Sequence, residues 1–292
     1  ALNDEVLQSK TKNCLCSVYF GKNIIGIAFL DISTGEFLTS QGNQEYIDKL
    51  LQNFSPSEIL VSKQKRLQFA ENFGEDFHTF NLEDWVYQSD YSNETLLKHF
   101  NTKSLKGFGV ENLTEGIIAS GSILHYLSET QHNKLEHITS VSRIAEDEYV
   151  WMDRFTIRNL ELYNSTNNNA VTLLNVIDKT ISPMGGRLLK RWLALPLKNV
   201  ERIKQRHEVV SFLKAEKTIH QKIQNHIKSI GDVERLISKV ATGKVSPREV
   251  IQLKNSLESI IPIKALSSNC DNESLKIIGD TLQGCDILRD KI

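Results

Sequence analysis

The chain has 292 residues, 40% of them hydrophobic and 24% charged, a composition typical of globular proteins with room for two domains. No run approaches the roughly 18 consecutive apolar residues that a membrane span requires, so we expect a soluble protein. The net charge of −1 hides an asymmetry, because residues 1–139 hold 11 Lys and Arg against 18 Asp and Glu, whereas residues 140–292 hold 24 against 18. This change of sign predicts one domain over 1–139 and a second over 140–292.

The N-terminal residues are polar and lack the apolar centre of a signal peptide. The chain begins with Ala1 rather than Met, which suggests a fragment of a longer protein. Cys14 and Cys16 lie two residues apart in an apolar run, so they share one face of a strand. We expect buried free thiols, because no CxxC pair or Cys/His ligand set accompanies them. Few cysteines and no export signal together predict a cytoplasmic protein.

The first 40 residues predict three strands joined by short turns. Residues 14–20 and 24–31 are apolar and favour strands, and residues 36–40 continue the pattern. Gly21-Lys22-Asn23 and Ser33-Thr34-Gly35 supply residues that favour tight turns. Because such short turns join neighbouring strands, we expect an antiparallel meander.

Amphipathic helices then alternate with short buried strands. We expect helices at residues 43–54, 63–72, 93–100 and 112–131, and strands at residues 58–62 and 76–80. Three antiparallel strands followed by this alternation is the order of the ribonuclease-H-like fold. The sequence therefore predicts a ribonuclease-H-like α/β domain over residues 1–139.

The second half is predominantly helical after a pair of expected strands at residues 138–144 and 149–152. Ser182-Pro183 predicts a helix start, with Ser as N-cap and Pro in the first turn, and Ser246-Pro247 repeats it. Asn199 is expected to cap the intervening helix. Periodic apolar residues predict further helices near residues 219–230, 233–240 and 250–266, and one short helix in the last 20 residues. Short polar connections between them predict an all-α bundle over 140–292.

Asp31 is the candidate metal ligand of an alternative function, a nuclease. Ribonuclease-H-like nucleases hold two Mg²⁺ ions with carboxylates at strand ends. Asp31 ends an early strand, and partners would come from Glu36, Asp84, Asp90 and Glu111. The stretch 31–35 is also good turn chemistry, because Asp and Ser side chains bond nearby backbone N–H groups. We favour the turn, since no second carboxylate has a compelling spacing.

Three cations of the helix after Ser182 form a second candidate site. Arg187, Lys190 and Arg191 fall at i, i+3 and i+4, opposite the apolar stripe of the same helix. Such a trio usually forms a solvated face, although it could also meet a phosphate or an acidic partner surface. We therefore regard Arg187, Lys190 and Arg191 as candidate partner-facing residues.

Other motifs are weak. Gly107-Phe108-Gly109 lacks the third glycine of a dinucleotide-binding loop and predicts a tight turn instead. No GxxxxGK[ST] motif occurs in the sequence, so no P-loop is expected in this chain. His220 and His226 lack a third metal ligand at a suitable spacing. We expect no catalytic, cofactor-binding or metal-binding residues.

Residues 173–197, LLNVIDKTISPMGGRLLKRWLALPL, resemble the signature of the core domain of the MutS family of DNA mismatch repair proteins. The matching positions are Asp178, Thr180, Pro183, Met184, Gly185, Arg187, Leu189, Trp192, Leu193, Pro196 and Leu197. Residues 30–37 (LDISTGEF) and 107–111 (GFGVE) resemble the MutS connector domain, to which the family assigns a ribonuclease-H-like fold. The signature marks a fold: we expect Pro183 to start the helix, Gly185 to permit close packing and Trp192 to fill a core. Trp192→Ala should then cost roughly 3–5 kcal/mol.

The resemblance implies a non-catalytic fragment of a larger ATPase. The mismatch-reading domain would precede residue 1, and the clamp and the ATP- and Mg²⁺-binding ATPase would follow residue 292. The resemblance implies that the full-length protein binds mismatched DNA and ATP, forms a homodimer and recruits MutL through residues 1–139. Residues 140–292 would be part of a helical core and lever. The alternatives are the nuclease above and a free-standing DNA-binding module using the basic half.

Overall fold

The described residues of the chain, in a computed structural model, are 14–131, 135–144, 148–163 and 170–292. They form two compact units. The first unit contains residues 11–146 and 151–161, and the second contains 147–150 and 162–292. The chain therefore passes from the first unit to the second, returns for eleven residues and leaves again. The first unit extends past the predicted end at residue 139.

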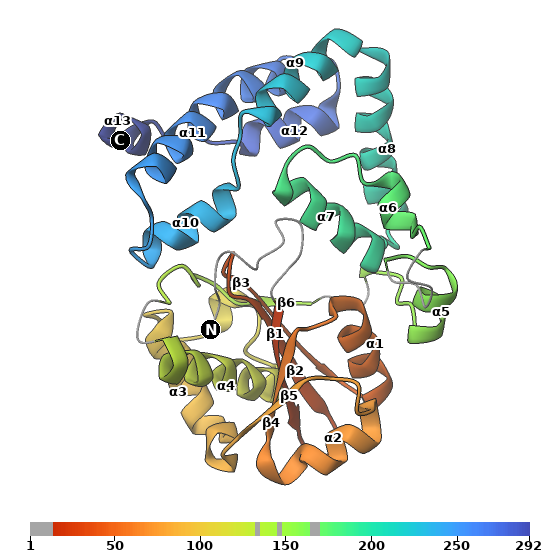
Figure 1. Cartoon of the computed structure of the whole chain (residues 1–292), viewed down its shortest axis with the longest axis vertical. Helices are drawn as coiled ribbons and strands as arrows, with labels where there is room; N and C mark the ends of the chain where they lie inside the picture. The colour runs from red at the N-terminus through yellow and green to blue at the C-terminus, as the bar shows by residue number, and fades with distance from the viewer. Residues whose placement is uncertain (1–13, 132–134, 145–147, 164–169) are drawn as a thin grey trace. The chain divides into compact units, whose positions relative to one another are not determined.

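A mixed sheet forms the centre of the first unit (Figure 1). Its described strands run in the order β5-β4-β1-β2-β3-β6. Their bounds are β1 Cys14–Phe20, β2 Ile25–Asp31, β3 Glu36–Gly42, β4 Glu58–Ser62, β5 Thr79–Leu82 and β6 Ser142–Arg143. Strands β1, β2 and β3 are antiparallel, which confirms the predicted meander. Strands β4 and β5 continue the sheet parallel to β1, and β6 lies parallel to β3.

Helices cover both faces of this sheet, giving a three-layered α/β unit (Figure 1). The helices of this unit are α1 Gln44–Phe54, α2 Arg66–Phe73, α3 Ser89–His99, α4 Thr114–Gln131 and α5 Arg154–Asn159. Short 3-10 turns η2 Lys63–Lys65, η3 Asp84–Tyr87 and η4 Lys106–Phe108 join some of them. Side chains of β1 alternate between the two faces of the sheet, as in any strand. Leu15 packs on the side of α3 and α4, and Cys16 packs on the side of α1 and α2.

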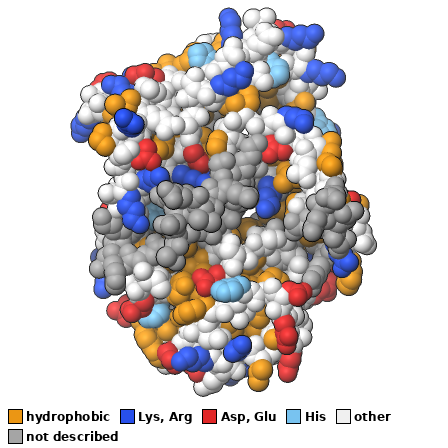
Figure 2. All heavy atoms as spheres, viewed as in Figure 1, with side chains coloured by type: hydrophobic (Ala, Val, Ile, Leu, Met, Phe, Trp, Pro, Cys, Tyr) orange, Lys and Arg blue, Asp and Glu red, His pale blue; other side chains and the backbone are white. Residues whose placement is uncertain are grey.

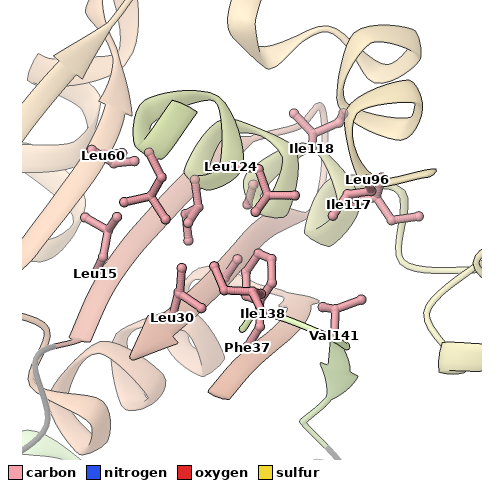
Figure 3. Packing of buried hydrophobic residues seen from close by; sticks show 14 of the residues in the cluster. Leu15, Leu30, Phe37, Leu60, Leu96, Ile117, Ile118, Leu124, Ile138 and Val141 are labelled. Carbon is pink, nitrogen blue, oxygen red and sulfur yellow. The ribbon is translucent and has the colours of Figure 1, made fainter. Parts of the chain in front are cut away.

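The core under α4 is the larger of the two hydrophobic clusters. Figure 3 shows Leu15, Leu30 and Phe37, from three different strands, beneath α4, with Leu124 among the residues facing them. Val141, from the segment after α4, closes the same cluster. Together these residues tie the meander, the crossover strands and the later segment into one core.

Helix α4 approaches the sheet unusually closely. A Cβ atom at Gly26 would lie 2.0 Å from the carbonyl oxygen of Glu115, so only glycine fits at this position of β2. The hydroxyl of Thr39 on β3 donates to the carbonyl of Gly116, 3.0 Å away. Small residues on both elements therefore seat the helix on the sheet.

The second unit is helical (Figure 1). Its helices are α6 Leu173–Ile177, α7 Pro183–Ala194, α8 Val200–Ala215, α9 Lys217–Lys228, α10 Val233–Ala241, α11 Pro247–Ser268, α12 Glu273–Thr281 and α13 Asp286–Lys291. Leu236 of α10 packs with Leu253 and Leu257 of α11 in a small core. Figure 2 shows hydrophobic side chains at the surface of these helices, scattered among Lys and Arg. None of the helices in the described part of the chain could cross a membrane.

Several predicted elements differ from the structure. In the described parts of residues 138–152, the expected strand pair is reduced to the two residues of β6, and Tyr149 instead bridges to Leu197 in the second unit. The expected single terminal helix is two helices, α12 and α13, because Cys285 takes a left-handed conformation with φ 48° between them. The short helices α5 and α6 lie in the half that was expected to be helical, but the sequence pattern gave no bounds for them.

Candidate functional site

The signature segment begins with a turn built around Asp178. One carboxylate oxygen of Asp178 accepts hydrogen bonds from the backbone N–H of Thr180 at 2.9 Å and from its hydroxyl at 2.5 Å. This is an Asx-type turn, in which the short side chain replaces a backbone acceptor. The turn fixes the direction in which the chain enters α7.

Helix α7 begins as predicted. Ser182 is the N-cap, and its hydroxyl accepts from the backbone N–H of Gly185 at 3.1 Å. Pro183 occupies the first turn, where its missing N–H leaves no hydrogen bond unmade. A Cβ at Gly185 would lie 3.1 Å from the Ser182 hydroxyl and 3.5 Å from the Cβ of Thr180. The close packing expected at Gly185 is therefore with the turn that precedes α7, not with a separate helix or strand.

Arg187 is buried, only 3% exposed, and its guanidinium faces two carboxylates at the start of α10. It donates to both oxygens of Asp232 at 2.8 and 2.7 Å, and to Glu234 at 3.2 and 2.5 Å. Burial alone would lower the pKa of Arg187, but the hydrogen bonds and charges of Asp232 and Glu234 outweigh it and raise that pKa. The paired fork geometry makes this a strong charge-assisted contact.

The expectation that Arg187 shares an exposed cationic face with Lys190 and Arg191 is therefore wrong for Arg187. Lys190 and Arg191 are half-buried. The ammonium of Lys190 lies 5.8 Å from the ring centroid of Tyr163, whose pKa burial raises to about 12. Helical spacing placed the three cations on one side of α7 but could not show that the start of α10 covers part of that side. Contact of Lys190 and Arg191 with a partner remains a prediction.

Trp192 does not fill a core. It is 41% exposed, and the guanidinium of Arg206 on α8 lies 3.6 Å from its ring centroid. Of the other apolar side chains in the stripe of α7, Leu188 is 47% exposed, and Met184 and Leu189 are half-buried. The stripe of α7 is thus largely open in the described chain, which corrects the expected packing.

The segment after α7 is held by backbone contacts. The carbonyl of Pro196 accepts from the N–H of Val150 at 2.8 Å, and Lys198 donates to the carbonyl of Glu148 at 2.9 Å. Together with the bridge from Tyr149 to Leu197, these bonds attach residues 148–150 to the helical unit. Of the signature residues, Asp178, Thr180, Pro183 and Gly185 shape the backbone, and Arg187 joins a buried charge network with Asp232 and Glu234.

Asp31, the candidate nuclease ligand, is a turn residue, as we favoured. Its carboxylate accepts from the N–H of Ser33 at 2.9 Å and from the Ser33 hydroxyl at 2.6 Å. Its carbonyl accepts from Gly35, which adopts φ 78°. The side chain is 3% exposed, so this turn fastens the β2–β3 connection into the protein.

Among the described residues, the carboxylates considered with Asp31 do not gather into a group of three or more that could hold a metal ion. Asp84 accepts from the hydroxyl of Ser62, at the end of β4. Strand β4 runs parallel to β1, and Asp31 lies beside Cys14, the first residue of β1. The two carboxylates therefore lie at opposite ends of the sheet, roughly 15 Å apart, whereas paired catalytic metals sit about 4 Å apart. Glu36 lies opposite Asp31 on the neighbouring strand β3 and is therefore the candidate that adjoins it, whereas Asp90 and Glu111 are exposed.

The remaining motifs supply no ligands in the described structure. Gly109 takes φ 67° and ends the turn η4, as expected of a tight turn before α4. No group of three or more His, Cys, Asp or Glu side chains in the described ranges could hold a metal ion. Cys14 and Cys16 are buried thiols, as predicted.

The comparisons with known proteins agree with this two-part organisation. Residues 13–139 match the family described as MutS domain II, and residues 155–291 match MutS domain III. An α/β unit followed by a helical unit, carrying the signature segment around α7, thus defines two consecutive domains of a MutS-type protein. Over all 292 residues, the chain is 69% identical to the DNA mismatch repair protein MutS of Flavobacterium psychrophilum and 55% identical to that of Bacteroides thetaiotaomicron. The chain belongs to the MutS family of DNA mismatch repair proteins.

The chain spans 34% of the length of each of these curated relatives.

Asp232 and Glu234 were not predicted as partners of Arg187. Their position at the N-terminal end of α10 was a usable signal, because acidic residues at a helix start often face a cation or the helix dipole. Nothing in the sequence indicated which cation they would bind.

Proposed function

We propose that this chain is a structural and allosteric part of a mismatch repair protein that, at full length, binds mismatched DNA and ATP with Mg²⁺ and acts as a homodimer in the cytoplasm. The α/β unit would connect the mismatch-reading part to the rest, and the helical unit would act as a lever. The buried network of Arg187 with Asp232 and Glu234 carries this proposal. It clamps α7 to the start of α10, as a stiff transmitting element requires.

The first unit is proposed to have the ribonuclease-H-like fold without nuclease activity. Three antiparallel strands flanked by the parallel strands β4 and β5 support the fold. The turn bonding of Asp31 and its separation from Asp84 support the loss of activity. Incubation with labelled DNA and Mg²⁺ or Mn²⁺ tests this: cleavage by the chain that is abolished by Asp31→Asn would contradict it.

The lever is tested in the full-length protein. Without nucleotide, Arg187→Met should bind mismatched DNA near the parental level. Its ATP-triggered release from that DNA should be weaker, because the contact between α7 and α10 is loosened. Arg66→Met, which removes an exposed cation from α2, is the control and should change neither step. Parental ATP-triggered release in a folded Arg187→Met protein would contradict a transmitting role.

Docking of MutL on the first unit is proposed at the outer side of α3. A cavity of about 550 Å³ supports this choice. It is lined by Tyr91, Glu94, Thr95, Lys98, His99, Leu124, Ser128, Leu135 and Glu136. The buried residues Leu124 and Leu135 line this cavity together with charged side chains, a mixture of apolar and polar groups typical of protein interfaces.

A photo-crosslinker at position 94 tests the docking site in the full-length protein. Glu94 is exposed on α3, and Glu71 is exposed on α2, a helix of the opposite layer. We expect MutL to be captured from position 94 and not from position 71. Capture through residues 140–292 but not through 1–139 would overturn the assignment.

A further inference from the structure

Three aromatic side chains next to the α3 cavity form a compact surface cluster, here called the aromatic triad: Trp85, Tyr91 and His125. The ring centroids of Trp85 and Tyr91 lie 5.1 Å apart, those of Trp85 and His125 5.1 Å, and those of Tyr91 and His125 5.8 Å. Each pair is edge to face. The Tyr91 hydroxyl and the Nδ1 atom of His125 are hydrogen-bonded at 2.8 Å. The triad therefore holds its rings in fixed positions before any ligand arrives.

Trp85 is the exposed member of this cluster. It is 49% exposed, whereas Val86 and Tyr87, which follow it in η3, are 1% and 6% exposed. The buried neighbours anchor the turn and leave the indole at the surface. An ordered aromatic ring of this size offers a large contact area at little cost in side-chain entropy, as in many binding sites.

Three acidic side chains, Glu94, Glu129 and Glu136, lie near the triad. Glu94 lies one helical turn after Tyr91 and lines the same cavity, to which Glu136 also contributes. Glu129 lies one turn after His125 and interacts electrostatically with it. Among the described residues that line the cavity, Lys98 is the one Lys or Arg, and residues 1–139 carry seven more acidic than basic residues.

We infer that the aromatic triad and its acidic surroundings bind a basic peptide segment of a partner protein, with an Arg or Lys side chain over the Trp85 indole. A cation over a tryptophan face is attracted by the ring quadrupole, and nearby carboxylates add to this attraction. The same acidic field opposes nucleic acid, whose phosphates need basic surfaces. The inference rests on the proposed docking role of the first unit and names the chemistry of the partner.

A peptide titration tests the inference with the whole chain. The probe is a fluorescein-labelled peptide of alternating Arg and Gly, and the comparison probe replaces each Arg with Glu. Trp85→Leu should weaken binding of the Arg peptide roughly fivefold to tenfold, because the ring face is lost but an apolar side chain remains. Trp85→Phe should retain part of the affinity. The matched control is Phe80→Leu, which changes another exposed aromatic residue of the same unit, 42% exposed and packed on Tyr126.

The double variant Glu94→Gln/Glu129→Gln should also bind the Arg peptide more weakly than the parent chain. Its affinity should depend less on the salt concentration, because two of the attracting charges are gone. Equal binding of the Arg and Glu peptides, or parental affinity in a folded Trp85→Leu chain, would overturn the inference. If MutL is captured from position 94 but Trp85→Leu binds the Arg peptide as tightly as the parent chain, the proposed docking of MutL is supported and the cation site is contradicted. If binding of the Arg peptide depends on Trp85 but MutL is not captured from position 94, the cation site is supported and the proposed docking of MutL is contradicted.

Discussion

Arg187 places a charge inside the helical unit, where Asp232 and Glu234 balance it. A buried ion pair need not stabilise a protein relative to an apolar replacement, but removing one partner leaves the other charge uncompensated. Here the partners differ in burial, because the Asp232 side chain is 16% exposed and that of Glu234 is 49% exposed. The larger share of any penalty should therefore come from Asp232.

We predict that Arg187→Met lowers the free energy of unfolding by about 3 kcal/mol, near the lower end for breaking a buried pair because water reaches Glu234. Arg187→Lys should recover only part of this loss, since a single ammonium cannot reproduce the paired contact. Urea unfolding followed by circular dichroism measures both. Arg202→Met is the control: it breaks the exposed pair with Glu148 and should cost about 0–1 kcal/mol. A loss no greater than that of the control would show that the network adds nothing to stability.

The exposure of Trp192 changes the expected cost of truncating it. We predict about 1–2 kcal/mol for Trp192→Ala, below the 3–5 kcal/mol expected of a core position, because only the half-buried ring and its contact with Arg206 are lost. Leu257→Ala, in the core with Leu236, should cost about 2–5 kcal/mol. Denaturant curves on the two variants check the ranking, and a reversed order would contradict this placement of Trp192.

The limit of sequence reading at this scale is visible in α7. The spacing of its residues correctly gave the helix start, because the Ser182 cap and Pro183 act within one turn. The surroundings of Arg187 and Trp192 depend on α10 and α8, more than ten residues away along the chain. Helical periodicity says which side a residue lies on, but it does not say what covers that side.

The elements of the sheet were predicted almost to the residue where local chemistry is decisive. Strands β1 and β4 have their expected bounds, because apolar runs end at turn residues. Helix α3 begins four residues earlier than expected, at Ser89, because polar residues form its first turn and hide the period. The small helix α6 is set by a capping box between Thr172 and Asn175 rather than by an apolar stripe.

The contact between α4 and β2 gives a prediction for an element pair. Gly26→Ala should destabilise the first unit by about 3 kcal/mol or more, because the new Cβ meets the backbone of Glu115 and the helix must shift. Gly107→Ala is the matched control, since a Cβ there meets nothing within 4 Å. Thermal unfolding of the two variants decides the matter, and equal melting temperatures would contradict the close approach.

Helix α11 contains a pH-dependent cap. The backbone N–H of Ser246 and the side chain of Lys239 hold the pKa of Glu249 down at about 2, from 4.5. Because the folded-state pKa is the lower one, this contribution is present above pH 4.5 and disappears as the pH falls toward 2. Between those values, the stability of the parent chain should fall more steeply than that of Glu249→Gln. Parallel slopes in acid titrations followed by circular dichroism would contradict the cap.

At the scale of the whole molecule, the change of charge near residue 140 predicts two parts, but it does not predict the course of the chain between them. Residues 142–143 pair with β3 as β6, so the first unit does not end at 139. Residues 151–161 then return to it after 147–150 have joined the helical unit. The charge balance is a sum over many residues, so it cannot show that a short segment belongs to the other unit.

We predict that a fragment of residues 14–161 melts at least roughly 5 °C higher than one of residues 14–139. The shorter fragment loses Val141 and Ile144, both buried in the cores, and the edge-to-face contact of Trp151 with Tyr46. Differential scanning calorimetry on the two fragments measures the difference. Identical melting temperatures would mean that the returning segment contributes nothing to the first unit.

The repeated passage of the chain between the units also bears on how such a protein can evolve. A recombination event with a breakpoint between residues 140 and 161 would join one parent's edge strand or returning helix α5 to another parent's sheet. Exchanges of that kind should succeed only between close relatives. The two units, although compact separately, are therefore expected to be inherited as a single block.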